Sequence, residues 1–291
     1  MDETTRLVLT IFAGIFGLLI GSFLNVCIFR LPRNCMSIVK PRSRCIRCLK
    51  FIAWYDNLPV LSWLFLRGKC RHCSEGISFR YPAVELLTGG LMVYVAVGQL
   101  YGEPVSAFHQ ILFFSMQAYL CAALIACTFI DLEFQILPDE ITLSGIVIGL
   151  VCGAAFPAIH GAGLPALDWN PHLLGGVASL LGAILGAGST YTVRVVGSIL
   201  YKQEAMGLGD VKFMAFLGAF LGWKGILLTF LLGCFAGALF GVGYLVVKGR
   251  LRGVQVPFGP FLALGAVLVI FFAPEVNDLI RAYLDMFRGE A

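Results

Sequence analysis

Seven long apolar stretches constrain this chain more than any other feature. They cover residues 7–29, 82–101, 108–130, 141–159, 173–200, 225–247 and 256–273. A helix needs roughly 20 apolar residues to cross a hydrocarbon core of about 30 Å, and each stretch meets or approaches that length. Only 13% of the 291 residues are charged, against about a quarter in soluble domains. The sequence therefore predicts an all-α polytopic membrane protein.

The basic residues predict the orientation of these spans. Of the 21 Lys and Arg residues, 11 lie in residues 30–80, where Asp56 and Glu75 are the only acids. Basic loops stay in the cytoplasm, so this segment is expected inside and the N-terminus outside. The basic residues of 248–252 also belong inside, provided that the short apolar stretch 211–223 crosses the membrane. If it does cross, the chain has about eight transmembrane helices. We interpret the first apolar stretch as a permanent span rather than a signal peptide.

Four cysteines in the basic segment predict a metal site. They form two Cys-x-x-Cys pairs, Cys45 with Cys48 and Cys70 with Cys73. Such pairs are typical of one zinc ion held tetrahedrally by four thiolates. Four thiolates leave no open position for substrate, so the expected role is structural. Closing the loop stabilises a segment too small for its own core. Disulfides are the alternative, which a reducing cytoplasm disfavours, and His72 is a weaker alternative ligand.

Two aspartates stand where predicted spans meet the cytoplasmic face. Asp131 ends one span, and Asp210 follows Gly207 and Gly209 at the start of the short stretch. An ionisable group at membrane depth is a functional candidate by default, and glycine permits close approach of backbone segments. Two neighbouring carboxylates share a proton, so one can activate water while the other protonates a peptide carbonyl. The pair predicts aspartic proteolysis at the edge of a bilayer.

The alternative for these acids is a helix cap or a solvated loop position. For Asp139 we prefer that alternative, because an acid directly after Pro138 at a helix N-terminus is favoured by the helix dipole. A single Gly-x-Gly-Asp motif is weak evidence for catalysis. Its coincidence with Asp131 and with the four cysteines is what favours a catalytic role for Asp210.

Several ordered blocks carry a resemblance to a known family. They are "GSFLNVCIFRLP" at 21–32, "DNLPVLSWLFLRGKC" at 56–70, "RYPAVELLTG" at 80–89, "DLEFQILPD" at 131–139, "GLGDVK" at 207–212 and "PFGPFLA" at 257–263. With these blocks and the cysteine pairs, nearly the whole chain resembles the type IV prepilin peptidases. These are bifunctional leader peptidase/N-methyltransferases of type IV pilus and type II secretion systems.

The resemblance implies an activity and its residues. Asp131 and Asp210 would be the catalytic aspartates, with Gly207 and Gly209 completing the motif. The resemblance also implies prepilin or pseudopilin substrates, and S-adenosylmethionine as methyl donor for the new N-terminal residue, usually phenylalanine. Residue chemistry alone does not predict methyl transfer, because no glycine-rich nucleotide loop is visible. Glu85 and Lys69 are weak candidates for binding the donor.

The predicted organisation has four parts. Residues 1–29 form the first transmembrane helix, 30–81 the cytoplasmic four-cysteine loop domain, 82–275 the transmembrane catalytic domain and 276–291 an interfacial tail. The expected location is the bacterial inner membrane, with the zinc loop and the active site at the cytoplasmic face. We expect contacts with lipid and a prepilin substrate and no nucleic-acid partner, while the oligomeric state is left open.

Two other functions compete with this interpretation. A Gly-x-Gly-Asp leader peptidase without methyl transfer, such as a preflagellin peptidase, would share the aspartates, but such enzymes lack the four-cysteine loop. A proton-coupled transporter is a candidate of another class. It would require acids deep within the spans, and an inverted repeat would support it, whereas these acids lie at one face and no repeat is visible.

Overall fold

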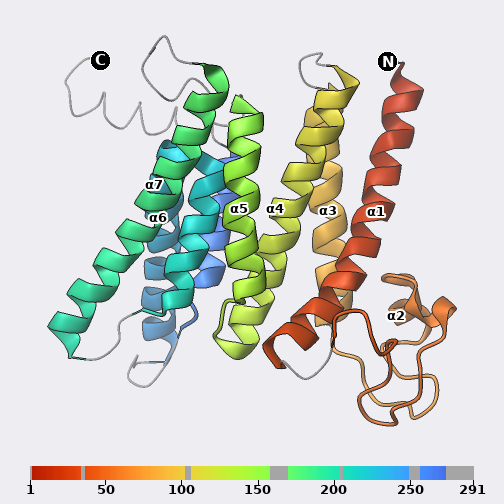
Figure 1. Cartoon of the computed structure of the whole chain (residues 1–291). Helices are drawn as coiled ribbons and strands as arrows, with labels where there is room; N and C mark the ends of the chain where they lie inside the picture. Colours follow the sequence, from red (N-terminus) through yellow and green to blue (C-terminus); the bar gives the residue numbers. More distant parts are fainter. Residues whose placement is uncertain are drawn as a thin grey trace. The chain divides into compact units, whose positions relative to one another are not determined.

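A computed structural model describes residues 2–33, 37–101, 106–157, 170–202, 206–248 and 256–272. In these ranges the chain is helical apart from its loops and two isolated β-bridges in the cysteine segment, which confirms the all-α prediction. The elements are α1 (Glu3–Arg30), η1 (Leu31–Arg33), η2 (Trp54–Asn57), α2 (Leu61–Phe65), α3 (Arg80–Tyr101), α4 (Ala107–Phe134), α5 (Asp139–Ala155), α6 (Pro171–Tyr201), α7 (Leu208–Lys248) and a last helix, Gly259–Phe272 (Figure 1).

Five of the described helices are long and apolar enough to cross a membrane: α1, α3, α4, α6 and α7. Helix α5, with 17 residues, and the last helix are shorter and also apolar. The chain is therefore a multi-pass membrane protein. The interfacial tail predicted at 276–291 lies outside the described residues.

Helix α7 is two antiparallel helices joined at Gly222. A straight helix of its 41 residues would be about 60 Å long, twice the thickness of a hydrocarbon core. Gly222 has a φ of 67°, a conformation that glycine adopts without steric cost. A Cβ placed on Gly186 of α6 would contact both Met214 and Ile226, which a straight helix would separate by about 18 Å.

The chain therefore reverses direction at Gly222. Residues 208–221 form one short helix and 223–248 form a second one beside it. This reversal confirms that the apolar stretch 211–223 is a separate helical segment, and it brings the apolar helices among the described residues to eight.

The chain forms two compact units, Met1–Ile130 and Asp131–Ala291, here called the N-terminal and C-terminal units. The boundary falls inside α4, immediately before Asp131. In the N-terminal unit α1 packs closely on α3. A Cβ on Gly21 would lie 2.6 Å from the Cα of Glu85, so this glycine is required for the close approach of the two helices.

The C-terminal unit packs α5, α6 and the two halves of α7 around small and aromatic residues. Ser179 of α6 donates its hydroxyl to the carbonyl of Gly149 in α5 at 3.3 Å and to that of Ala219 in α7 at 2.8 Å. Phe213 and Phe216 of α7 are fully buried, and a Cβ on Gly145 of α5 would meet the ring of Phe216. Because the packing fixes the first half of α7, it also fixes the position of the helix end that carries Asp210.

Candidate active site and metal centre

Asp131 is a buried acid in the last turn of α4, with 5% of its surface exposed. Its Oδ2 accepts a hydrogen bond of 2.9 Å from the backbone N–H of Gly259, 128 residues later in the chain. Gly259 is the first residue of the last helix, where the backbone N–H groups have no partner within the helix and favour a negative charge. A Cβ on Gly259 would lie 2.6 Å from this oxygen, so a larger residue would displace the carboxylate or the helix end.

Asp210 is the third residue of α7 and is partly buried. Its carboxylate accepts a hydrogen bond from the backbone N–H of Gly207, and its charge interacts repulsively with that of Asp131. The first contact is the acid half of an N-terminal helix cap, which orients the side chain. The repulsion indicates that the two acids selected from the sequence lie near one another in the C-terminal unit.

The loop between α4 and α5 is fastened to the start of α7. Gln135 has a φ of 56° and its N–H donates to the carbonyl of Asp131 at 2.9 Å, which ends α4. Asp139 opens α5, and its carboxylate binds the Nζ of Lys212 at 2.7 and 2.8 Å. Lys212 lies two residues after Asp210. The ion pair therefore links the segment that follows Asp131 to the helix that carries Asp210.

The four cysteines of the loop segment form one cluster. The sulfur atoms of Cys45, Cys48, Cys70 and Cys73 all lie within 4.8 Å of one another. The Sγ atoms of Cys45 and Cys73 are 3.7 Å apart, and four thiolates at about 2.3 Å from a tetrahedral zinc ion would be separated by about 3.8 Å. The donor set and its spacing therefore fit a metal ion.

The two cysteine pairs have the same backbone geometry. Cys45 and Cys70 each accept a backbone hydrogen bond of 2.9 Å, from Leu49 and Ser74, which both have a positive φ. Each pair is closed by an isolated β-bridge, Arg44 with Phe51 and Lys69 with Gly76. The backbone N–H groups of Cys73 and His72 lower the pKa of Cys70 to about 7, which favours the thiolate that binds metal.

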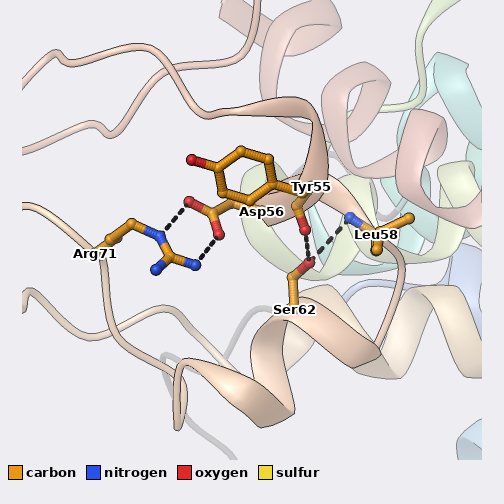
Figure 2. Close-up of polar contacts among 5 residues, drawn as sticks. All are labelled: Tyr55, Asp56, Leu58, Ser62 and Arg71. Carbon is orange, nitrogen blue, oxygen red and sulfur yellow. Dashed lines mark hydrogen bonds and ion pairs between the residues drawn. The ribbon is translucent and has the colours of Figure 1, made fainter.

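An ion pair supports the chain between the two cysteine pairs. Arg71 donates from Nε and from a terminal nitrogen to the carboxylate of Asp56, at 2.7 and 2.5 Å (Figure 2). The Arg71 hydrogen bonds hold the pKa of Asp56 below its ordinary value. Ser62 accepts from the N–H of Leu58 and donates to the carbonyl of Tyr55 beside it. These contacts order residues that have little core of their own.

Glu85 and Lys69, the two candidates for binding a methyl donor, have different surroundings. Glu85 is 7% exposed, and its Oε2 accepts a hydrogen bond of 2.7 Å from the N–H of Val60, which has a φ of 60°. Lys69 is exposed, and its backbone pairs with Gly76. Glu85 thus supports a strained turn, and the assignment of both residues to the donor site stays a prediction.

Sequence reasoning missed two parts of the site. It did not predict the hydrogen bond from the N–H of Gly259 to Asp131. It also interpreted Asp139 only as a helix N-terminal acid and missed its ion pair with Lys212. A lysine two residues after Asp210, inside an apolar stretch, was the signal that could have indicated the ion pair.

The comparisons with known proteins cover most of the chain. Residues 15–98 match the bacterial peptidase A24 N-terminal domain, and residues 118–242 match the type IV leader peptidase family. The prepilin leader peptidase/N-methyltransferase of Aeromonas salmonicida is 35% identical over 90% of each chain, and that of Xanthomonas campestris pv. campestris is 36% identical over 92% of each. That of Myxococcus xanthus is 39% identical over 82% of this chain and 64% of its own. No solved structure matches.

These matches run through both units and include the segments of the cysteine cluster and of both aspartates. Identity above one third over nine tenths of the chain goes well beyond a shared motif. The chain therefore belongs to the type IV leader peptidase family.

Proposed function

We propose that Asp131 and Asp210 hydrolyse the leader peptide bond of a prepilin or pseudopilin. The chain is a prepilin leader peptidase/N-methyltransferase by its relationship to the family, and the proposal concerns the residues that cleave the bond. The observation that carries it is the hydrogen bond of Gly259 to a buried Asp131 whose charge interacts with that of Asp210. Three chain segments far apart in sequence converge there on two carboxylates.

The chemistry follows from one proton shared by the pair. One carboxylate takes a proton from water as the water oxygen attacks the scissile carbonyl carbon, and the other protonates the carbonyl oxygen. When the tetrahedral intermediate collapses, the C–N bond breaks and the amine leaves with a proton. The products are the leader with a free carboxylate and the mature chain with a free N-terminal amine.

The substrate follows from the position of the pair. Both aspartates lie near the ends of apolar helices, on the side assigned to the cytoplasm by the basic residues. A substrate with a polar leader in the cytoplasm and an apolar helix in the bilayer places its scissile bond at that level. We infer that the enzyme works at the cytoplasmic face of the bacterial inner membrane.

The four cysteines would hold one zinc ion in a structural role. Their geometry leaves no ligand position for substrate, since four thiolates complete a tetrahedron. The metal would join the two cysteine pairs and order the loop segment between α1 and α3. S-adenosylmethionine, when bound, supplies the methyl group that the new N-terminal amine receives. The chain's part in that step is to hold the amine in line with the methyl carbon.

The proposed function is tested with a synthetic prepilin peptide, the purified enzyme and S-adenosylmethionine. Mass spectrometry reads leader loss and the gain of one methyl group in the same sample. Both changes are expected. Leader loss without methylation would support the alternative peptidase without methyl transfer, and an intact peptide would contradict the proposed function.

A single variant separates the two reactions. Because methyl transfer needs no carboxylate pair, Asp210→Asn is expected to methylate a pre-cleaved pilin peptide at a near-normal rate while it fails to cleave a prepilin. Glu85→Gln, in the other unit, is expected to lower methylation more than cleavage. A folded Asp210→Asn enzyme that cannot methylate the pre-cleaved peptide would show that the two reactions share one site.

A further inference from the structure

A short linker, residues 135–138, joins α4 to α5 and is fixed to both helices. At its start, Gln135 has a positive φ and donates its N–H to the carbonyl of Asp131 at 2.9 Å. At its end, the carbonyl of Pro138 accepts hydrogen bonds of 3.1 Å from both the N–H and the hydroxyl of Thr142, which is fully buried in α5. The linker therefore has a defined path between the two helices.

The middle of the linker packs on the residue before Asp210. Leu137 is buried, and a Cβ on Gly209 would lie 3.2 Å from the Cβ of Leu137 and 3.6 Å from its backbone nitrogen. Because Gly209 has no side chain, the linker lies directly against the backbone of the first turn of α7. This contact gives the second glycine of the Gly-x-Gly-Asp motif a packing role.

The ion pair of Asp139 with Lys212 holds the same side of this turn. Gly209 and Lys212 are three residues apart, and residues at this spacing are neighbours on the surface of a helix. Asp210 is displaced from Gly209 by about 100° around the helix axis. The linker and Asp139 thus restrain the first turn of α7 from a side other than the one that carries the Asp210 carboxylate.

These contacts are better suited to positioning than to stability. The side chains of Lys212 and Asp139 are 38% and 54% exposed, and an ion pair so exposed adds little to the free energy of unfolding. A displacement of about 1 Å in a catalytic group, in contrast, costs roughly a hundredfold in rate. Asp131 is the first residue of the C-terminal unit, although most of α4 belongs to the other unit. Contacts inside the C-terminal unit therefore set its spacing from Asp210.

We propose that the linker and Asp139 form a brace that fixes the spacing of Asp131 and Asp210, with Lys212 as a positioning residue for hydrolysis. The inference rests on the proposed function. Lys212 acts through Asp139 and does not touch the reacting atoms. With the brace intact, the two carboxylates hold water and the scissile carbonyl at the distances that proton transfer needs. With the ion pair removed, the protein stays folded and binds its substrate, but the spacing of the carboxylates varies.

The experiment measures kcat and KM for cleavage of a synthetic prepilin peptide by the full-length enzyme in detergent. Lys212→Met, which keeps an unbranched side chain without its charge, and Asp139→Asn are each expected to lower kcat about tenfold and to leave KM within about twofold. Both remove the same contact, so the double variant is expected to be no slower than the worse single one. Lys212→Arg retains the ion pair and is expected to restore kcat to within about threefold of the wild type.

Glu140→Gln is the matched control for Asp139→Asn. Glu140 is also an acid in the first turn of α5, but it is exposed and forms no ion pair with another residue that the structure describes. Its replacement removes a charge from the same helix end and leaves the brace intact, so kcat should equal that of the wild type. All variants should unfold at temperatures close to that of the wild type.

The outcomes separate the brace from the proposed function. Wild-type kcat in Lys212→Met and Asp139→Asn, or an equal loss in Glu140→Gln, would overturn the brace. A raised KM with unchanged kcat would instead indicate that Lys212 contacts the substrate, and a fall in unfolding temperature parallel to kcat would indicate a role in stability. Either of these results also overturns the proposal. If the wild-type enzyme leaves the peptide intact, the proposed function itself fails.

Discussion

The cysteine cluster and the aspartate site are built in opposite ways. The cluster joins two short turns with the same backbone geometry, and local hydrogen bonds such as that from Leu49 to Cys45 shape each turn. The aspartate site joins the end of α4, the start of α7 and the start of the last helix. The first site needs only a correctly spaced loop and a metal ion. The second depends on the packing of the whole C-terminal unit.

This difference predicts where small changes have large effects. A change that leaves all helices folded can disable the aspartate site by shifting one of three helix ends. The cysteine cluster should instead respond to loss of a ligand, with effects confined to residues 37–80. The following variants test that contrast, from the largest expected effect to the smallest.

Among variants that keep both aspartates, the largest effect is expected for Gly259→Ala. The added methyl would lie 2.6 Å from Oδ2 of Asp131, so either the carboxylate or the helix end must move. A misplacement of about 1 Å costs roughly a hundredfold in rate, and we expect kcat to fall by at least that factor. Peptide cleavage and thermal unfolding in detergent are the measurements. Gly243→Ala, at a glycine with open space around its Cβ, is the control, and near-normal kcat in Gly259→Ala would contradict the proposed geometry.

A smaller effect on catalysis is expected for Cys48→Ser. Loss of one thiolate is expected to reduce bound zinc from one equivalent to near zero, because four ligands are needed to close the site. Residues 37–80 should then be cut faster by added protease, whereas α5–α7 remain protected. Metal analysis and limited proteolysis read these changes, with Cys152→Ser, outside the cluster, as control. Wild-type metal content in Cys48→Ser would contradict the assignment of the four cysteines as a zinc site.

Asp56→Asn should have the smallest effect and a defined pH dependence. Arg71 is half exposed and the pair lies outside the candidate membrane spans, so its loss should lower loop stability only slightly. The pKa of Asp56 is lowered in the folded state. Its contribution is therefore complete above the unfolded pKa of about 3.9 and disappears as the pH falls through the folded value.

Hydrogen exchange of residues 37–80 measures this effect. Wild type and Asp56→Asn should differ by a constant amount near neutral pH and converge in acid. A difference that grows as the pH falls would contradict the ion pair as its source.

Sequence patterns predicted what depends on local chemistry. The apolar stretches predicted the helices, because a backbone buried in lipid must form its hydrogen bonds internally. The cysteine spacing predicted the cluster. The basic residues also predicted that Asp131 and Asp210 share one membrane face. The structure adds that the charges of the two carboxylates repel each other.

Contacts between distant helix ends could not be predicted in this way. The reversal at Gly222, the ion pair of Asp139 with Lys212 and the hydrogen bond from Gly259 to Asp131 each depend on how helices pack. No feature of the sequence distinguishes Gly222 and Gly259 from the many other glycines of the spans. Only the packed structure shows that the first is a chain reversal and the second a donor to an acid.

The central claim is that Asp131 and Asp210 act as one catalytic unit, and prepilin cleavage by three variants tests it most directly. Asp131→Asn and Asp210→Asn are each expected to lose at least about a thousandfold in kcat, and the double variant to be no slower than the worse single one, because residues that act together are not additive. All three should unfold at temperatures close to that of the wild type. Near-normal cleavage by either folded single variant would contradict the account.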